Sequence, residues 1–457
     1  MPRHTTGSGA RGAVVTVDDL AHGGDGVARL EGQVYFVRGA LPGDRVTLRE
    51  VQQRRRHALA EVSSLVEASP LRVPATCTHH PACGGCPWHE LQDTAQLEAK
   101  IRIVAETLRR LARLDIEKLP PLEIAPGDHQ IVDGLIRCVR AGQGEGYRIR
   151  ARLHLERRGD HTRAGYRAAR SHHVIDVEHC LVLHPSLAPS VSMALQRARD
   201  EGWPRGELHV ALGLQPLHTS AVLRSAERPH DPEVLARALT DCGFVGAQIL
   251  CRRDDEVLAA QGEIALGGVI APEAPGGPFG HDPWTFTQPQ HAGNRLLIEA
   301  VQLACDPAPG VHILELHAGA GNLSLGLAGR GATLRSVENA PHALHWLRAN
   351  VQRAGAADRI EVLAADVETL PLQELAAGAE PDVLLLDPPR TGFSRLSELV
   401  QQLRPARVVY VSCDPATLAR DLRPLGDLGY APARILLIDL MPGSWHVETV
   451  LLLQRTV

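Results

Sequence analysis

The last third of this chain carries a regular alternation of short apolar segments, and this feature limits its possible folds most strongly. The segments occupy 311–316, 333–337, 360–363, 382–386, 407–411, 433–439 and 448–453. Helical patterns separate most of them, and strand–helix alternation of this kind folds into a doubly wound α/β sheet. Ligands bind beyond the carboxyl ends of the strands in such sheets, so we expect the functional residues of a domain over 281–457 to lie there.

Bulk composition excludes several classes of protein. Hydrophobic residues make up 44% of the chain, yet no apolar run approaches the about 20 residues of a membrane-spanning helix. The first ten residues, MPRHTTGSGA, contain no apolar signal core. We therefore expect a cytoplasmic protein without a membrane partner, and nothing implies an obligate protein partner. The nine cysteines favour metal binding or catalysis over a disulfide framework.

A formal net charge of -5 conceals one strongly basic stretch. Residues 137–170 contain ten arginines against Glu145, Glu156 and Asp160, enough positive charge to neutralise several RNA phosphates. Arginine alternates with other side chains over 147–155, as in a strand with one basic face. The alternative interpretation is a solvated face that is rich in arginine because the chain has only two lysines.

The N-terminal region 1–66 alternates short β-branched segments with glycine turns, which indicates a small β-barrel. Its strings HGGDGVAR at 22–29 and GALPGDRV at 39–46 resemble the TRAM domain, an OB-like RNA-binding barrel. A barrel that only packs against its neighbour is the alternative.

A mixed segment, 67–280, follows the barrel and predicts a central α+β domain. Apolar residues at spacings of three and four predict one amphipathic helix over 91–114, capped by Asp93-Thr94, which we expect to be core scaffolding. Proline and glycine at 272–278 mark the expected boundary with the domain over 281–457.

Polar residues follow the predicted strands of the C-terminal domain. The first strand runs into the turn HAGAGN at 317–322, and Glu338 ends the second, where an acid can bond ribose hydroxyls. NAD enzymes share this layout. Asp366 after the third strand could bond an adenine, and the DPPR tip at 387–390 favours a methyltransferase over a dehydrogenase.

The fifth strand brings a cysteine to the same edge. Cys413 lies at its tip beside Asp387 of the neighbouring strand, and Glu448 opens the last strand. A nucleophile, an orienting carboxylate and a base can therefore converge. A buried structural cysteine is the alternative.

Three strings resemble the RNA (uracil-5)-methyltransferases: LLDPPR at 385–390, VSCDPATLARD at 411–421 and HVET at 446–449. The resemblance spans nearly the whole chain and, with the TRAM-like barrel and a cysteine group, is strongest to the branch that modifies 23S ribosomal RNA. It implies a class I, Rossmann-like, S-adenosylmethionine-dependent enzyme that forms 5-methyluridine. It further implies the following residues around the cofactor and the base: Gln288, His317, Gly319, Asn322, Glu338, Asp366 and Asp387.

The resemblance also implies how the reaction proceeds. Uracil C5 is too electron-poor to attack a methyl sulfonium unaided, so the Cys413 thiolate adds to C6 and the resulting enolate attacks the methyl group through C5. Glu448 then removes the C5 proton and elimination frees the cysteine, while Asp387 bonds the uracil edge. The target base must be single-stranded or flipped out of its stack.

Some positions depart from the family pattern. Glu315 stands where Asp is usual, His317-Ala318 where Phe-Cys is usual, and Gln290 where Asn is usual. Because such changes could weaken cofactor binding, an RNA-binding assembly factor that has lost its cofactor is one competing function. A transfer RNA uracil-5 methyltransferase is another, and a methyltransferase acting on exocyclic nitrogens, which needs no nucleophilic cysteine, is a third.

Cysteines form one compact group in the central segment. Cys77, Cys83 and Cys86 surround Gly84-Gly85, which permit a tight wrap around a metal, and Cys180 is the remote fourth candidate. Four thiolates hold either a [4Fe–4S] cluster or structural zinc. The resemblance implies a structural [4Fe–4S] cluster on these four residues. We expect the other candidates to be core thiols: Cys138, Cys242, Cys251 and Cys305.

Overall fold

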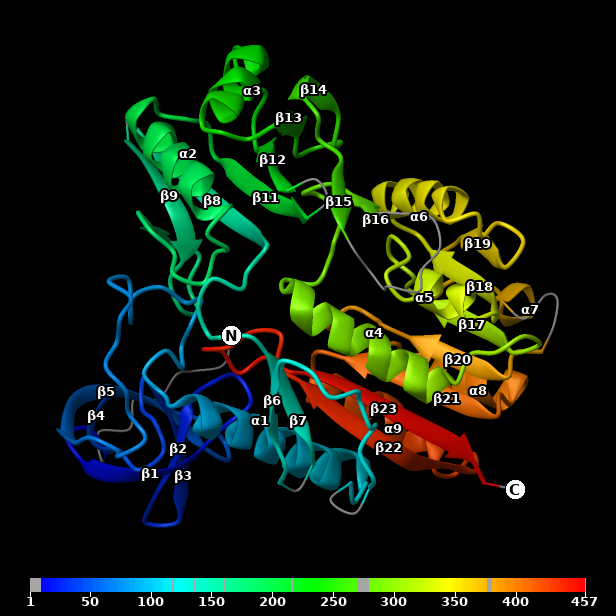
Figure 1. Cartoon of the computed structure of the whole chain (residues 1–457). Helices are drawn as coiled ribbons and strands as arrows, with labels where there is room; N and C mark the ends of the chain where they lie inside the picture. Colours follow the sequence, from blue (N-terminus) through cyan, green and yellow to red (C-terminus); the bar gives the residue numbers. More distant parts are fainter. Residues whose placement is uncertain are drawn as a thin grey trace.

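The computed structural model describes residues 10–116, 119–134, 136–159, 161–214, 217–268, 279–375 and 380–456. Their strands form a closed barrel, a seven-stranded sheet, a two-stranded sheet and a nine-stranded sheet. In Figure 1 the blue barrel lies beside the nine-stranded sheet, and the green seven-stranded sheet lies above both of them. No helix in these described ranges is both long and apolar enough to cross a membrane.

The N-terminal barrel has the strand order β1-β2-β3-β5-β4. Its strands are β1 (Val14–Leu20), β2 (Gly26–Leu30), β3 (Gln33–Arg38), β4 (Arg45–Gln53) and β5 (Ala58–Glu67). Residues two apart fill the interior, such as Val15 with Val17 and Val46 with Leu48, because successive side chains of a strand point to opposite faces. The predicted N-terminal barrel is confirmed.

The seven-stranded sheet has the order β10-β9-β8-β11-β12-β13-β14. Its strands are β8 (Arg150–Arg158), β9 (His161–Arg167), β10 (Val174–Asp176), β11 (Gly206–Leu214), β12 (Leu217–Ser225), β13 (Gly246–Cys251) and β14 (Val257–Gly262). Helices α2 (Ala188–Asp200) and α3 (Pro232–Asp241) share one apolar core with it. Leu153 and Leu155 of β8 point into that core, whereas Arg152 points away, as the predicted alternation requires.

The nine-stranded sheet has the order β19-β18-β17-β20-β21-β23-β22-β7-β6. Each of the seven predicted strands is present: β17 (His312–Leu316), β18 (Thr333–Glu338), β19 (Ile360–Ala364), β20 (Val383–Leu386), β21 (Arg407–Ser412), β22 (Tyr430–Ile438) and β23 (Glu448–Arg455). Strands β17 to β21 are parallel, and β23 runs antiparallel to β21. The doubly wound C-terminal domain is therefore confirmed, with its ligand edge where these parallel strands end.

Helices cover both faces of the nine-stranded sheet (Figure 1). On one face lie α4 (His291–Cys305), α5 (Ser324–Gly329) and α6 (Pro341–Arg353), and on the other α1 (Asp93–Thr107), α8 (Leu396–Leu403) and α9 (Pro415–Leu422). Shorter elements complete the fold: α7 (Leu372–Leu375), η2 (Arg423–Leu425), β15 (Leu266–Gly268) and β16 (Phe279–His281).

Part of the segment 67–280 belongs to the nine-stranded sheet. Strands β6 (His129–Val132) and β7 (Cys138–Ala141) extend it beyond β22, and α1 packs Leu97 and Ile101 against it. The segment therefore contributes strands to the seven-stranded, the two-stranded and the nine-stranded sheet, while the expected boundary at 272–278 lies outside the described residues.

Two details of the predicted helix over 91–114 were wrong. Its N-cap is Gln92, and Asp93 forms an ion pair with Arg140 instead of capping (2.8 Å). The α-helix ends at Thr107 and continues as the π-helical turn η1 (Leu108–Ala112). Because this turn changes the angular spacing of side chains, Leu111 is 49% exposed although the uniform helical spacing predicted it on the buried face.

Candidate active site

Three reactive side chains meet at the carboxyl-end edge of the nine-stranded sheet. Asp387 follows β20, Cys413 follows β21 and Glu448 opens β23, which pairs with β21 through Ser412 opposite Thr449. The negative charges of both carboxylates act on the Cys413 thiol and raise its pKa. The structure thus brings together the three side chains that the sequence offered as nucleophile, base and orienting carboxylate.

Burial governs the titration of these three groups. It raises the pKa of Cys413 to about 12, and that of Glu448 to about 8 with a further contribution from Asp387. The pKa of Asp387 rises to about 7, through burial and the charge of Glu315. Arg390 acts in the opposite direction on Cys413 and Glu448. Both carboxyl groups therefore titrate near neutral pH, the range in which a general base is effective.

The turn after β17 has space for a ligand. Gly319 has a φ of 58°, and nothing lies within 4 Å of the position that a Cβ would take. Glu338 accepts hydrogen bonds from the backbone N–H groups of Gly319 (2.9 Å) and Asn339 (2.8 Å), which fix its carboxylate beneath the turn. His317 Nε2 is buried and has no hydrogen-bond partner among the described residues. Backbone and side-chain groups suited to a nucleoside therefore surround this turn.

The other sequence-predicted ligand contacts are less tightly grouped. Asp366 follows β19 and, with Glu338, acts electrostatically on His317. Asn322 exchanges two side-chain hydrogen bonds with Asn294 of α4 (2.8 and 2.9 Å). Gln288 is buried in the segment that leads into α4. His317, Glu338 and Asp366 therefore interact at this edge of the sheet, and Asn322, the last residue of the turn after β17, connects the turn to α4. Gln288 lies in the segment before α4.

Two departures from the family pattern have structural partners. Glu315 is buried beneath the turn, where its carboxylate accepts hydrogen bonds from Ser324 Oγ (2.5 Å) and Ser336 Oγ (2.7 Å). Burial still raises the pKa of Glu315 to about 7. Gln290 donates from Nε2 to the Ala141 carbonyl on β7 (2.5 Å). Both longer side chains thus have hydrogen-bond partners within the fold: Glu315 bonds two serine hydroxyls, and Gln290 bonds one backbone carbonyl.

Sequence reasoning missed the residues that flank the cysteine. Arg390 lies 3.2 Å from His446 Nε2, and the His446 ring lies 3.8 Å from that of Trp445, centroid to centroid. The Trp445 ring also lies 4.8 Å from that of His22 in the barrel, centroid to centroid, and His22 Nε2 lies 3.6 Å from Asp414 Oδ2. Arg390, His446 and His22 lay within the recognised strings and Trp445 beside one, but the contact of His22 with Trp445 gave no signal because it joins two distant segments.

Comparisons with known proteins decide the family. The family described as tRNA (Uracil-5-)-methyltransferase matches residues 281–456, and the TRAM domain matches 14–62. The chain is 32% identical, over 96% of each protein, to the 23S rRNA (uracil(1939)-C(5))-methyltransferase RlmD of Methylococcus capsulatus. It belongs to the S-adenosylmethionine-dependent RNA (uracil-5)-methyltransferase family.

Two further comparisons agree with membership of this methyltransferase family. A protein of the same name from Aromatoleum aromaticum is 33% identical over 97% of this chain and 99% of its own length. A crystal structure of Pyrococcus abyssi tRNA (uracil-54, C5)-methyltransferase in complex with S-adenosyl-L-homocysteine superposes with a TM-score of 0.68 at 21% identity. That likeness covers 96% of this chain and 100% of the other, so the two share one fold throughout.

The methyltransferase also has a pocket lined by Cys77, Cys83, Cys86 and Cys180. Burial and the charges of the neighbouring thiols raise the pKa of Cys83 and bring that of Cys86 to about 12. Within the described ranges, no group of three or more His, Cys, Asp or Glu side chains is close enough to hold one metal ion. The remaining candidates are buried: Cys138, Cys242, Cys251 and Cys305.

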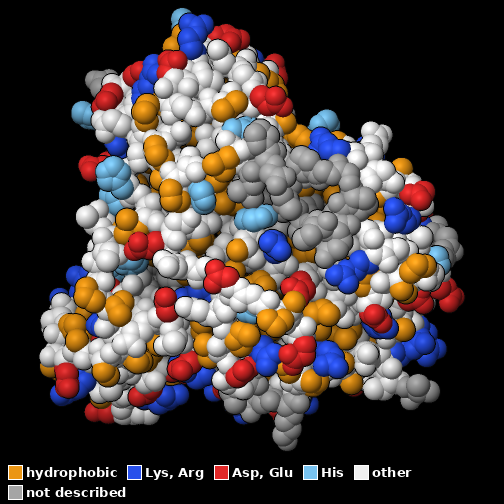
Figure 2. Space-filling view, in the orientation of Figure 1, with side chains coloured by type: hydrophobic (Ala, Val, Ile, Leu, Met, Phe, Trp, Pro, Cys, Tyr) orange, Lys and Arg blue, Asp and Glu red, His pale blue; other side chains and the backbone are white. Residues whose placement is uncertain are grey.

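The arginines of 137–170 do not form one basic face in this methyltransferase. Several are engaged by structural partners: Arg137 by Glu123 and Asp133, Arg140 by Asp439, Arg150 by the Thr287 carbonyl and Arg170 by Asp25. Arg152, Arg157 and Arg167 are exposed along β8 and β9. Figure 2 shows acidic and basic side chains interspersed over the face that it displays. The expected local excess of charge is therefore partly neutralised within the fold.

Proposed function

We propose that this protein transfers a methyl group from S-adenosylmethionine to C5 of a uridine in 23S ribosomal RNA, through a covalent bond to Cys413. The observation that carries the proposal is the meeting of Cys413, Glu448 and Asp387 at one strand edge, in a chain belonging to this family. The relatives at 32% and 33% identity carry the name of 23S rRNA (uracil(1939)-C(5))-methyltransferases, which favours this substrate.

The nucleophile must first become a thiolate. Burial keeps Cys413 as a neutral thiol in the free protein, because its pKa is about 12. Arg390 favours the ionised form. In this proposal the thiol releases its proton to water before it attacks. The sulfur then bonds to C6 of the uracil, and the electrons of the C5–C6 double bond move into an enolate. Asp387 holds the edge of the ring.

The base acts after methyl transfer. S-adenosylmethionine, when bound, supplies the electrophilic methyl group to which C5 bonds. Glu448 then takes the C5 proton, the C5–C6 double bond forms again, and the C6–S bond breaks to return the Cys413 thiolate. A pKa of about 8 suits this role. Part of the Glu448 population is ionised near neutral pH and can take a proton, and the resulting acid then holds that proton.

The turn after β17 supports cofactor binding. Gly319 leaves open space beside the backbone, and the carboxylate of Glu338 retains lone pairs that can accept from ribose hydroxyls. The unpartnered Nε2 of His317 offers a further polar contact. Asp366, the proposed adenine contact, lies close enough to this turn to act electrostatically on His317. The competing assembly-factor function, which needs a lost cofactor site, is less well supported by these groups.

We also propose that Cys77, Cys83, Cys86 and Cys180 hold a structural [4Fe–4S] cluster. The four side chains line one pocket, and four thiolates are the usual ligand set of such a cluster. Protein purified without oxygen should contain about four irons per chain. Cys180→Ala should abolish the iron and Cys138→Ala should not, whereas stoichiometric zinc would contradict the cluster.

Mapping of 5-methyluridine tests the substrate. Total RNA from cells with and without the gene is compared, with ribosomal and transfer RNA analysed separately. We expect one 23S ribosomal uridine to lose its methyl group, and the purified protein to restore it. Loss of 5-methyluridine from transfer RNA alone would show that transfer RNA is the substrate, with the same chemistry. Loss from neither RNA, with no S-adenosylmethionine binding by the purified protein, would support the assembly-factor alternative.

A further inference from the structure

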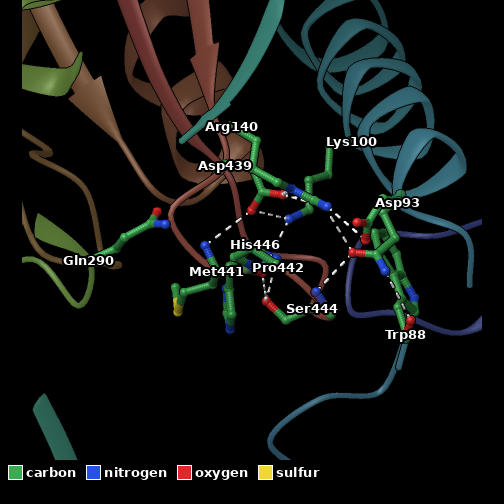
Figure 3. Close-up of polar contacts among 12 residues, drawn as sticks. Trp88, Asp93, Lys100, Arg140, Gln290, Asp439, Met441, Pro442, Ser444 and His446 are labelled. Atoms are coloured by element: carbon green, nitrogen blue, oxygen red, sulfur yellow. Dashed lines mark hydrogen bonds and ion pairs between the residues drawn. The ribbon is translucent and has the colours of Figure 1, made fainter. Parts of the chain in front are cut away.

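A group of buried charges lies behind the loop that leads to Glu448. Figure 3 shows Lys100 of α1 and Arg140 of β7 converging on Asp439, directly after β22. The Lys100 Nζ lies 2.6 Å from one oxygen of Asp439, and the Arg140 guanidinium lies 2.7 Å from the other. All three side chains are 0% exposed. Segments far apart in the sequence therefore meet at this carboxylate.

The same group holds the start of the hairpin connection, residues 439–447, which we call the 439–447 loop. Met441 N donates to Asp439 Oδ1 (3.1 Å), and Lys100 Nζ donates to the Met441 carbonyl (3.3 Å). Both backbone polar groups of Met441 are therefore fixed by the buried charges. Ser444 Oγ donates to the same carbonyl (2.8 Å), which closes the loop on itself.

Neighbouring groups hold the middle of the 439–447 loop (Figure 3). Gln96 Oε1 accepts from Gly443 N (2.8 Å) and from Arg140 (3.0 Å), while Trp88 N donates to the Gly443 carbonyl (2.9 Å). Tyr147 Oη donates to the Pro442 carbonyl (3.3 Å). The loop backbone is thus bonded to α1 and to the segment that follows Cys86.

The path of the 439–447 loop decides where Glu448 points. Ile438 and Glu448 are paired in the β22–β23 ladder, so the loop begins and ends at this pair. Successive side chains of a strand face opposite ways, and a slip of one residue would turn the Glu448 carboxylate to the other face of the sheet. A fixed loop therefore fixes the base.

Stability alone explains these charges poorly. Burial lowers the pKa of Lys100, and the charge of Asp439 opposes that effect. Apolar residues of similar volume often stabilise a core as well as a buried ion pair does, whereas a buried pair demands one geometry. Asp93 lies 2.8 Å from Arg140 and adds a second carboxylate. The two cations, Lys100 and Arg140, are therefore balanced in charge by two carboxylates.

We infer that Lys100 and Asp439 are positioning residues, which hold the 439–447 loop so that Glu448 stands beside Cys413. This inference rests on the proposed function, in which Glu448 is the base. It predicts that loss of either charge slows removal of the C5 proton more than it affects binding of S-adenosylmethionine or addition of the cysteine.

Lys100→Met tests the inference in the full-length protein. Turnover should fall about 10- to 100-fold, because a misplacement of about 1 Å has effects of that order. The dissociation constant for S-adenosylmethionine should change less than about twofold, and a covalent protein–RNA species should accumulate on a denaturing gel. The control is Arg102→Met, which removes a half-exposed cation of the same helix that pairs with Asp19 and Glu98.

A purely structural role predicts a different pattern. Addition, methyl transfer and proton removal would then decline together with the fraction of folded protein, and no covalent species would accumulate. Lys100→Met that turns over like Arg102→Met would overturn the inference. Failure of Glu448→Gln itself to accumulate the species, beside an active wild type, would instead refute the proposed base.

A second variant covers the case in which Lys100→Met does not fold. Gln96→Met removes the acceptor for Gly443 N without leaving a charge unopposed, since Arg140 keeps Asp439 and Asp93. We expect the same covalent species with a smaller fall in turnover. A folded Gln96→Met with wild-type turnover and no accumulation would overturn the inference.

Discussion

Two clusters of ionisable side chains lie at the two ends of the 439–447 loop, and they differ in charge balance. At one end, Asp439 is buried between Lys100 and Arg140, so a cation faces each carboxylate oxygen. At the other, Glu448 is buried beside the half-buried Asp387, and the charge of Asp387 helps to raise the pKa of Glu448. Opposed charges fix a geometry, whereas adjacent carboxyl groups in a desolvated site bind a proton near neutral pH and can exchange it.

Asp387→Asn removes one of the two adjacent carboxyl groups and should have the largest effect on activity. We expect kcat/KM to fall by about two to four orders of magnitude, through loss of the contact to the uracil edge. The pKa of Glu448 should also fall, because the charge of Asp387 raises it. The rising limb of the pH profile should therefore move to lower pH.

Asp358→Asn provides the control, since that carboxylate is 74% exposed in the same domain. It should leave both the rate and the profile unchanged. A profile that stays in place in Asp387→Asn would show that the two carboxyl groups do not interact as described.

The contribution of Glu448 to the free energy of unfolding should depend on pH. Glu448 has a folded-state pKa of about 8, above its ordinary value of 4.5, so between these values the folded protein holds a proton that the unfolded chain has lost. The contribution to stability is full below 4.5 and declines as pH rises through 8. Glu448→Gln should remove that decline, by on the order of a few kcal/mol, since one pKa unit is about 1.4 kcal/mol.

Urea unfolding of wild type and Glu448→Gln at pH 5 and pH 8 measures the difference. The stability of the variant relative to the wild type should be greater at pH 8 than at pH 5. Glu398→Gln, at an exposed carboxylate of α8, should follow the wild type at both values. Equal pH dependence in wild type and Glu448→Gln would contradict the raised pKa.

The smallest effect concerns two arginines of the stretch 137–170, one of them exposed and the other engaged in two ion pairs. Arg152 is exposed on β8, whereas Arg137 is paired with Glu123 and Asp133. If Arg152 contacts a phosphate, Arg152→Ala should lessen the slope of log affinity against log salt by about 0.7–0.9. Arg137→Ala should leave the slope unchanged. Equal slopes in all three proteins would remove Arg152 from the interface.

Local patterns in the sequence predicted the edge of the nine-stranded sheet well. Apolar periodicity located each of the seven strands, and the predicted end of each strand identified the residue that follows it. Cys413 and Asp387 therefore came together without any knowledge of tertiary contacts, because neighbouring parallel strands end at one edge. The loop residues before Glu448 could not be interpreted in the same way.

Contacts between distant segments explain what the sequence did not predict. Lys100 and Asp439 are 339 residues apart, and a lysine within an amphipathic helix is typical of a solvated face. Strands β6 and β7 join a sheet whose other members lie more than 150 residues later in the chain. The basic stretch was overestimated for the same reason, since the partners of Arg140 and Arg170, Asp439 and Asp25, come from remote segments.

The central claim, covalent catalysis by Cys413 with Glu448 as the later base, is tested most directly by trapping the protein–RNA species. Wild type, Cys413→Ala and Glu448→Gln are incubated with RNA and S-adenosylmethionine and separated on a denaturing gel. Glu448→Gln should add, transfer the methyl group and then stall, giving a strong shifted band that contains the methyl label. Cys413→Ala should give no band and no 5-methyluridine. Normal turnover by Glu448→Gln without a band, or methylation by Cys413→Ala, would contradict the account.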